Sequence, residues 1–245
     1  MDSEIEKTLS SLKSRHINGI FAQTSAEARE KILSMIPPSA AVGIGDSTTM
    51  HQMGILEALR KRGSKTLNPF ESKGAETSAD EFRKWNVRLR HEATLCDVFL
   101  TGTNALTRDG RLVNLDATGN RVAGMFWGHP LSLLIVGKNK IVKDLDEALE
   151  RIRKVIAPTH FRIRSAELGG RKRETPCVAT GKCSDCRSED RGCNVFTIIE
   201  GKPTQTNLNV ILVNEDLGLG WDPSWPEERI EKIRESYKKF VWIPV

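Results

Sequence analysis

The order of apolar and polar positions along the chain predicts strands that alternate with helices. Short apolar runs suited to buried strands are "NGIFAQT", "AAVGIG", "SKTLN", "DVFLTG" and "LSLLIVG". Longer segments with helical periodicity lie between them, such as "AEAREKILSMI" and "TTMHQMGILEALRKRG", the latter predicted as one helix. A helix that joins two strands indicates a crossover connection between parallel strands. The pattern therefore predicts an α/β fold that is Rossmann-like, with a mainly parallel sheet flanked by helices.

The same pattern divides one predicted domain, residues 1–245, into four segments. They are N-terminal helices and a strand (1–36), a core with loops at strand ends (37–157), a basic and cysteine-rich insertion (158–194), and C-terminal strands with a tail (195–245). In the first segment, Ser25 is the expected N-terminal cap of a helix. In the second segment, the last helix is expected to begin after its cap at Asp144 and to end near residue 157. In the last segment, "VFTIIEG" and "LNVILVN" are expected to form a hairpin, and a helix follows. The fold is thus predicted to carry a cysteine-bearing C-terminal extension.

Composition indicates a soluble globular protein, with 38% hydrophobic and 28% charged residues. The first residues, "MDSEIEKTLSSLKSRH", contain no apolar signal core, and the longest apolar stretch is too short to span a bilayer. We therefore expect no membrane span and a cytoplasmic location, where cysteines usually stay reduced.

The net charge of +5 includes a concentrated basic run, "HFRIRSAELGGRKRET", just before the cysteines. Two interpretations stay open, a solvated surface and a site for an anion such as a phosphate or an acidic cofactor. Few aromatic residues interrupt the run, and it contains no nucleic-acid reader motif. This argues against nucleic acid as the partner.

Two loops fall at strand ends, where open parallel sheets bind their ligands. The first is "VGIGDSTTMHQ", in which Gly43 and Gly45 permit close backbone approach and Ser47 and Thr48 offer hydroxyl groups to a small anion. The alternative is a tight turn capped by Ser47, and Asp46 would instead bind a ligand hydroxyl or amine. Because Thr48 stands where a third glycine belongs, the loop is not an NAD fingerprint.

The second loop, "DVFLTGTNALTRDGRLVNLDATGNRVAGMFWG", contains more small and polar residues than a connection needs, and such loops often carry function. It includes a predicted hairpin, "LTRDGRLVN", with Asp-Gly at its tip. Its candidate ligand-binding residues are Thr101, Gly102, Asn104, Asp109, Gly110, Asn114, Gly119 and Asn120. Asp46 and Asp116 are the candidate catalytic carboxylates, as general bases.

Four of the five cysteines, Cys177, Cys183, Cys186 and Cys193, lie within "PCVATGKCSDCRSEDRGC". The central Cys-x2-Cys supplies two thiolates on one turn, as in zinc and iron–sulfur sites, and nearby basic residues favour thiolates. The backbone at Cys177, which follows Pro176, is expected to be extended. A metal or cluster, a redox-active or disulfide-forming set, and reduced structural thiols all remain possible interpretations.

Together these segments resemble the LUD-domain lactate-utilisation proteins. The resemblance rests on "AAVGIGDSTTMHQMGILEAL", the second loop, "VGKNKIVKDLDEALERIR", "PCVATGKCSDC" and "VILVNEDLGLG". It implies the superfold shared by sugar-phosphate isomerases and coenzyme A transferases. It also implies an accessory subunit in oxidative use of lactate or a related carboxylate, beside iron–sulfur partner subunits. Whether the chain also forms a homo-oligomer stays open.

Two alternatives stay open beside that role. One is a stand-alone isomerase or transferase acting on a phosphorylated or acyl metabolite, and the other is a regulatory module that binds such a metabolite. The isomerases have acidic residues where this chain has the neutral Gly102-Thr103-Asn104, and no glutamate nucleophile of the coenzyme A transferase type is evident.

Overall fold

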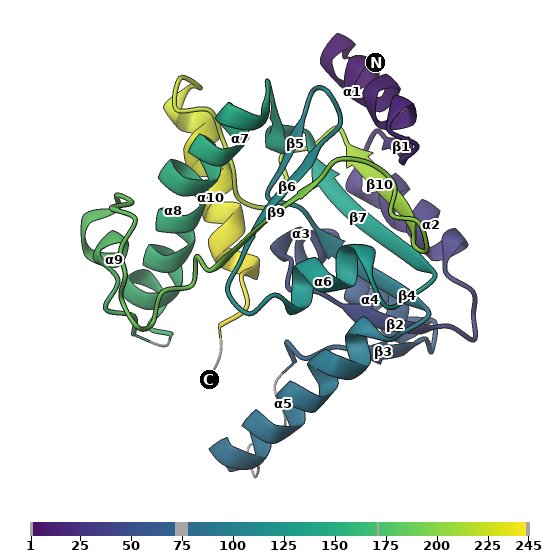
Figure 1. Cartoon of the computed structure of the whole chain (residues 1–245), viewed down its shortest axis with the longest axis horizontal. Helices are drawn as coiled ribbons and strands as arrows, with labels where there is room; N and C mark the ends of the chain where they lie inside the picture. Colours follow the sequence, from purple (N-terminus) through teal and green to yellow (C-terminus); the bar gives the residue numbers. More distant parts are fainter. Residues whose placement is uncertain (1, 72–77, 171, 244–245) are drawn as a thin grey trace.

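A six-stranded parallel sheet forms the centre of the protein, whose computed structural model describes residues 2–71, 78–170 and 172–243 (Figure 1). Its strands, in spatial order, are β1 (Asn18–Ala22), β10 (Asn207–Val213), β7 (Leu131–Gly137), β4 (Val98–Gly102), β2 (Ala41–Ile44) and β3 (Lys65–Leu67). Every neighbouring pair in this sheet is parallel. The predicted α/β class with a mainly parallel sheet is confirmed.

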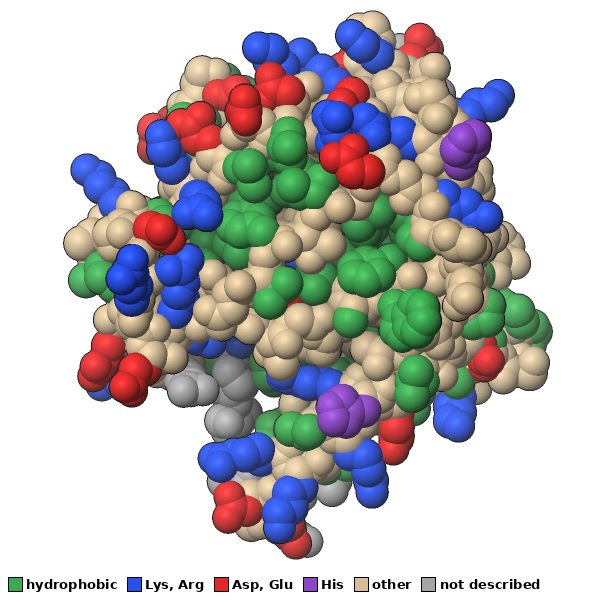
Figure 2. Space-filling view, viewed as in Figure 1, with side chains coloured by type: hydrophobic (Ala, Val, Ile, Leu, Met, Phe, Trp, Pro, Cys, Tyr) green, Lys and Arg blue, Asp and Glu red, His purple; other side chains and the backbone are tan. Residues whose placement is uncertain are grey.

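A second, smaller sheet lies across one face of the first. Among the described residues it contains β8 (Ile141–Val142), β5 (Ala105–Thr107), β6 (Leu112–Asp116) and β9 (Val195–Ile199), in that order. β5 and β6 form the hairpin that the sequence predicts. On the face seen in Figure 2, hydrophobic side chains gather in the middle and Lys and Arg side chains lie mostly around the rim.

The hairpin predicted between the last two strands is wrong. β9 pairs antiparallel with β6 in the small sheet, whereas β10 lies between β1 and β7 in the large one. Their burial explains the separation: Leu208 to Val213 are all buried, as suits a strand covered on both faces, while Val195 and Ile198 of β9 are exposed.

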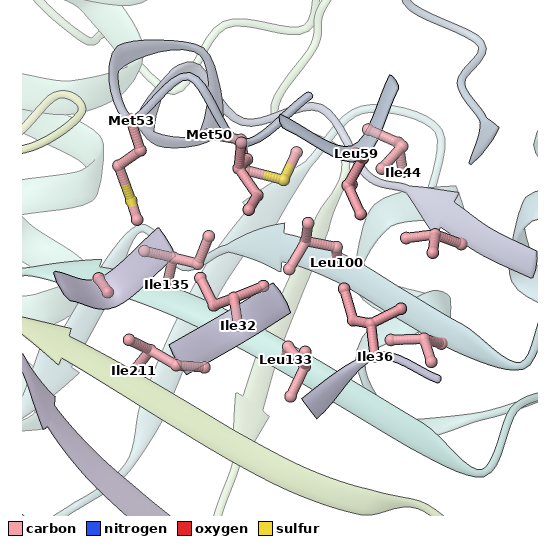
Figure 3. Packing of buried hydrophobic residues seen from close by; sticks show 14 of the residues in the cluster. Ile32, Ile36, Ile44, Met50, Met53, Leu59, Leu100, Leu133, Ile135 and Ile211 are labelled. Atoms are coloured by element: carbon pink, nitrogen blue, oxygen red, sulfur yellow. The ribbon is translucent and has the colours of Figure 1, made fainter. Parts of the chain in front are cut away.

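Helices cover both faces of the large sheet. The N-terminal helices are α1 (Ser3–Ser14), α2 (Ser25–Met35), α3 (Thr48–Gln52), α4 (Ile55–Lys61), α5 (Ala79–Thr94) and α6 (Asn120–Phe126). β7 shows how the faces divide: Leu133 and Ile135 pack with α2, α3 and α4 (Figure 3), whereas Leu134 and Val136 pack with α1, α6 and the small sheet. The alternation follows from the two-residue period of a strand.

Two local predictions in this half need correction. The segment after β2 is two helices rather than one, because Gly54 adopts a left-handed φ of +66° between them. The cap of α2 is Thr24, whose hydroxyl accepts the Glu27 N–H at 3.2 Å. Ser25 is already helical, and its hydroxyl bonds to Glu215 instead.

After β7, a short 3-10 turn (Lys138–Lys140) leads to β8 and then to a long helical segment. The segment comprises α7 (Leu145–Arg151), a π turn (Ile152–Ile156), α8 (Ala157–Arg162) and a second π turn (Ile163–Glu167). The cap at Asp144 is confirmed, since its carboxylate accepts the Glu147 N–H at 3.0 Å. The expected end near residue 157 is wrong: the helical segment continues through Pro158, which lies just after the first π turn.

The last helices are α9 (Pro176–Thr180) and α10 (Glu227–Phe240). α9 contradicts the extended approach expected at Cys177, because Pro176 begins a short helix instead. α8 lies beside α9 (Figure 1). His160 of α8 bonds to Tyr237 of α10. No helix in the described ranges is long and apolar enough to cross a membrane.

Candidate functional site: a basic cavity at the strand ends

A cavity of about 420 Å³ lies beyond the carboxyl ends of β2 and β4. Helix α10 and the segment around α8 complete its wall. Of the residues predicted from the two loops, it brings together Asp46, Ser47, Thr48, Gly102, Asn104, Asp116 and Asn120. Gly43, Gly45, Thr101, Asn114, Gly119, Asp109 and Gly110 do not line it.

The two loops adjoin because β2 and β4 are neighbours in the sheet. The Gly45 N–H donates to the Leu100 carbonyl at 3.0 Å, which joins the start of one loop to the strand before the other. A Cβ at Gly102 would lie 2.6 Å from the Ser47 hydroxyl, and a Cβ at Gly43 only 2.0 Å from the Ala93 carbonyl. These glycines therefore allow close packing beneath the cavity.

Asp109 and Gly110 lie at the other end of the hairpin, against α1. The Asp109 carboxylate pairs with Arg15 at 3.0 Å and also with Arg111. Gly110, with φ of +89°, packs against the backbone of Ser11. Their contacts attach the hairpin tip to the first helix.

Arg121 of α6 stabilises the conformation of the second loop through hydrogen bonds. Its guanidinium donates to five acceptors at 2.9–3.2 Å, which are the carbonyls of Gly102 and Leu115 and the side chains of Asn104, Asn114 and Asp116. A guanidinium has five N–H groups, so these bonds occupy its donor capacity. Arg121 gives the cavity positive charge, while its hydrogen bonds are used inside the protein.

The two candidate carboxylates differ in their contacts. Asp116 accepts the N–H groups of Thr118 and Gly119 at 3.0 and 2.8 Å and pairs with Arg121 at 3.2 Å. Both of its oxygens are therefore engaged in shaping the loop. Asp46 receives no hydrogen bond from any described residue, and its carboxylate faces the cavity.

Burial raises the pKa of Asp46, and the positive charges of Arg164 and Arg121 oppose that rise. Removal from water disfavours the ionised carboxylate, whereas nearby cations favour it. The result is a carboxyl group that takes up a proton more readily than a solvent-exposed aspartate and has oxygens available for a ligand.

Lys140 is a site residue that the sequence interpretation missed. It follows β7, is almost fully buried, and donates to the Thr49 hydroxyl at 3.1 Å and the Thr103 carbonyl at 2.9 Å. Burial, aided by repulsion from Arg121, lowers the pKa of Lys140 to about 7. The signal in the sequence was a lysine just after a strand end, in "VGKNK".

Two arginines and two aromatic rings form another part of the wall. Arg90 lies over the ring of Phe70 and Arg164 over that of Trp242, with 5.6 and 5.3 Å from guanidinium carbon to ring centroid. The two rings meet edge to face at 5.3 Å. The Arg90 Nε is buried and finds no acceptor among the described residues. A buried donor without a partner is a group that a ligand can satisfy.

A chain of side chains connects three helical segments at the cavity. His160 Nδ1 lies 2.6 Å from the Tyr237 hydroxyl, and Arg164 lies 3.3 Å from His160 Nε2. Because an arginine can only donate, Nε2 must accept, so Nδ1 carries the proton and donates to Tyr237. Burial and nearby arginines hold the pKa of His160 well below its usual range, and burial raises that of Tyr237.

The basic run contributes to this cavity in part. Arg164 and Arg173 line it, while Arg162 and Lys172 are exposed and Arg171 lies outside the described residues. Taken together, the cationic side chains around the cavity are Arg90, Arg121, Lys140, Arg164 and Arg173, against the carboxylates Asp46 and Asp116. The lining is therefore predominantly positive, as suits a small anion.

All four clustered cysteines line a second cavity of about 30 Å³, under α8. Their thiols are free. Burial raises the pKa of Cys193 to about 11, and the Cys177 thiol adds to the rise. In the part of the chain that the structure describes, no three Cys, His, Asp or Glu side chains form a ready-made metal group. The four thiols therefore line one small cavity, but their sulfurs do not converge on one metal position.

Comparison with known proteins identifies the family. The model of the LUD domain matches residues 5–213, so this chain belongs to the LUD-domain family, and lactate-utilisation-type function is supported at that level. A DUF162 family protein from Deinococcus radiodurans is similar in structure, with 14% identity, a TM-score of 0.44, and 86% of this chain and 96% of that chain covered.

Ribose 5-phosphate isomerase A from Neisseria gonorrhoeae is similar over a shorter span. Its identity is 19% and its TM-score 0.31, with 50% of this chain and 56% of that chain covered. None of the curated proteins matches this sequence.

Proposed function

We propose that the basic cavity binds a small anionic metabolite, a carboxylate or a phosphate. The observation that carries this proposal is the excess of cationic side chains around the cavity, among them Arg90, Lys140 and Arg164, over its two carboxylates. Burying several cations is costly unless an anion compensates them. An anion with two or more oxygens can bond to Arg90 and at the same time stabilise the protonated form of Lys140.

The size of the cavity bears on the class of metabolite. At about 420 Å³ it is within the range of small-molecule sites and has more room than a three-carbon acid needs. Phe70 and Trp242 add apolar surface beside the cationic end. We infer a ligand with an anionic group and a larger body, for which lactate or phosphate serves as a minimal probe.

The experiment is calorimetric titration of inorganic phosphate, L-lactate and pyruvate into the whole protein. Arg90→Met should weaken binding of the best probe by about tenfold or more, since a charge-assisted hydrogen bond is lost. Arg88→Met is the matched control, because Arg88 is on the same helix with its side chain 73% exposed, and its change should stay under about twofold. No binding of any of the three probes, or equal losses in both variants, would contradict the proposed anion site.

For the role in metabolism, we propose an accessory subunit in oxidative use of lactate or a related carboxylate, beside iron–sulfur partner subunits. Membership in the LUD-domain family supports this. The isolated chain should then show no turnover of lactate with nicotinamide or flavin acceptors. Affinity purification of the tagged chain from its own cells should recover iron–sulfur proteins, and recovery of the chain alone would count against this role.

A second candidate function rests on Asp46. A carboxylate that faces the cavity, receives no hydrogen bond from the described residues and has a raised pKa is suited to act as a general base. A stand-alone isomerase or transferase would use it to abstract a proton from a phosphorylated or acyl metabolite. Steady conversion of a sugar phosphate or thioester by the pure protein, lost in Asp46→Asn, would favour this function over the accessory role.

A further inference from the structure

We propose that Cys177, Cys183, Cys186 and Cys193 together bind one Zn²⁺ ion, at a site separate from the anion cavity but sharing a wall with it. The four side chains come from a short helix and the loop that follows it, and all four line one small cavity. Four thiolates around a single ion are a tetrahedral structural zinc site.

The first two ligand positions are fixed by local backbone geometry. Cys177 lies in the first turn of α9, and the Gly181 N–H, at a left-handed φ of +70°, donates to the Cys177 carbonyl at 3.0 Å to end that helix. The chain thereby turns back so that Cys183 reaches the cavity that Cys177 lines.

The turn between the central cysteines is also specified. Asp185 adopts a left-handed φ of +47°, a conformation that aspartate tolerates better than most residues. The tight turn places Cys183 and Cys186 on the same cavity. Arg153 lies 3.4 Å from the Asp185 carboxylate and holds the turn against α8's helical segment.

Arg191 connects the backbone at Cys186 with the backbone at Cys193. Its guanidinium donates to the carbonyls of Cys186 and Cys193, the latter at 2.9 Å, and to the Asp185 carboxylate at 2.9 Å. One side chain thus sets the separation of two ligand positions and the turn before them. Its positive charge also offsets part of the negative charge of a tetrathiolate centre.

One metal ion is the smallest centre that four thiolates can share, and the metal and sulfide content of the protein distinguishes it from an iron–sulfur cluster. Cys183 is exposed and the other three cysteines are half-buried, and the four sulfurs must converge further when the ion binds.

The shared wall connects this site to the anion cavity. Gly192 and Cys193 line both spaces, as do Ala157 and Phe161. Arg173, one of the cations of the anion cavity, lies 5.0 Å from the Phe161 ring and donates to the Asp190 carbonyl in the same loop. A metal bound to Cys193 therefore orders the loop that positions Arg173. The effect of this ordering on anion binding rests on the proposed anion site.

The test measures metal and sulfide in the whole protein, purified without oxygen, then stripped and reloaded with Zn²⁺ or Co²⁺. One equivalent of zinc per chain is expected, with no sulfide. The Co²⁺ form should show the visible absorption of a tetrahedral thiolate complex. Cys183→Ser/Cys186→Ser should lose the metal, while Ser184→Ala in the same loop and Cys96→Ser, the thiol outside the cluster, should each keep one equivalent.

Several outcomes would overturn the proposal. They are several irons with sulfide in the anaerobic protein, a disulfide in the intact mass, no tight uptake of Zn²⁺ or Co²⁺, or metal retained by the double variant. Because the double serine variant could fail to fold, circular dichroism is recorded on it. Single Cys→Ser variants at each position should weaken Zn²⁺ binding at least tenfold without loss of the fold.

A second measurement separates this proposal from the anion site. Hydrogen exchange of residues 175–194 should slow on Zn²⁺ loading, whether or not an anion binds, because metal binding is coupled to ordering of its loop. If the anion site also exists, removal of zinc should weaken phosphate or lactate binding at least twofold. Zinc uptake without any anion binding would leave the metal site standing and contradict the proposed function, and unchanged exchange on zinc loading would contradict the metal site.

Discussion

At the scale of single residues, the charge of the anion cavity depends on Lys140. With a pKa of about 7 in the free protein, its amine is half charged near neutral pH. An anion stabilises the charged form, so binding raises this pKa. Below pH 7 the lysine is already charged, and above it each binding event must take up a proton. Anion affinity should therefore fall by up to about tenfold for each pH unit above 7.

Titrations of lactate between pH 6 and 9 measure this slope, because lactate keeps one negative charge over that range whereas phosphate changes its own protonation state near neutral pH. Lys140→Met should abolish the slope and weaken binding below pH 7, while its effect on stability is the balance between removing a buried cation and losing the hydrogen bonds to Thr49 and Thr103. Lys143→Met is the control, since Lys143 lies three positions later with its side chain 73% exposed. A slope that persists in Lys140→Met would show that another group titrates.

The ionised Asp46 carboxylate opposes binding of the same anion. Its folded-state pKa is raised, so its proton is retained to higher pH than in the unfolded chain, and the ionised form repels an anion. Asp46→Asn should tighten phosphate binding about three- to tenfold above the pKa of Asp46, and have no effect at a pH where Asp46 is protonated. Calorimetry at both pH values measures this, with the exposed Asp146→Asn as control.

At the scale of elements, the contact between β2 and α5 depends on a glycine. A Cβ at Gly43 would lie 2.0 Å from the backbone carbonyl of Ala93, which cannot move unless α5 shifts from the sheet. Gly43→Ala should lower the free energy of unfolding by about 2–3 kcal/mol. Denaturant titration measures this.

Gly201→Ala is the matched control, because its new Cβ would meet only the Arg15 carbonyl at 3.3 Å. It should change stability by less than about 0.5 kcal/mol. Similar effects of both substitutions would show that α5 tolerates displacement and that the close approach at Gly43 is unimportant.

At the scale of the whole molecule, the C-terminal segment returns to close the cavity. Trp242 follows α10 and packs edge to face on Phe70, which lies after β3, while Arg164 lies over the Trp242 ring. Trp242→Ala should lower the free energy of unfolding by about 1–2 kcal/mol through lost apolar burial. It should also weaken anion binding, because Arg164 loses its support.

Trp127→Ala serves as the control for size and chemistry, since Trp127 is 64% exposed. It should leave both stability and anion affinity nearly unchanged, as measured by thermal unfolding and calorimetry. Equal effects of the two substitutions would mean that Trp242 does not close the cavity.

Local patterns in the sequence determined most elements and the class of fold. The apolar runs marked β1, β2, β4, β7 and β10, and the Asp-Gly pair marked the hairpin between β5 and β6. These predictions hold because strand burial and turn geometry depend on neighbours a few residues away.

Only the tertiary structure decided which distant groups meet. The sequence shows that β10 is buried on both faces but not that it inserts between β1 and β7 instead of pairing with β9. Lys140 and Tyr237 appear as an ordinary loop lysine and a helix residue until the fold brings them to one cavity. Strand pairing and cavity lining depend on contacts between segments far apart in the sequence, and short-range periodicity does not identify those partners.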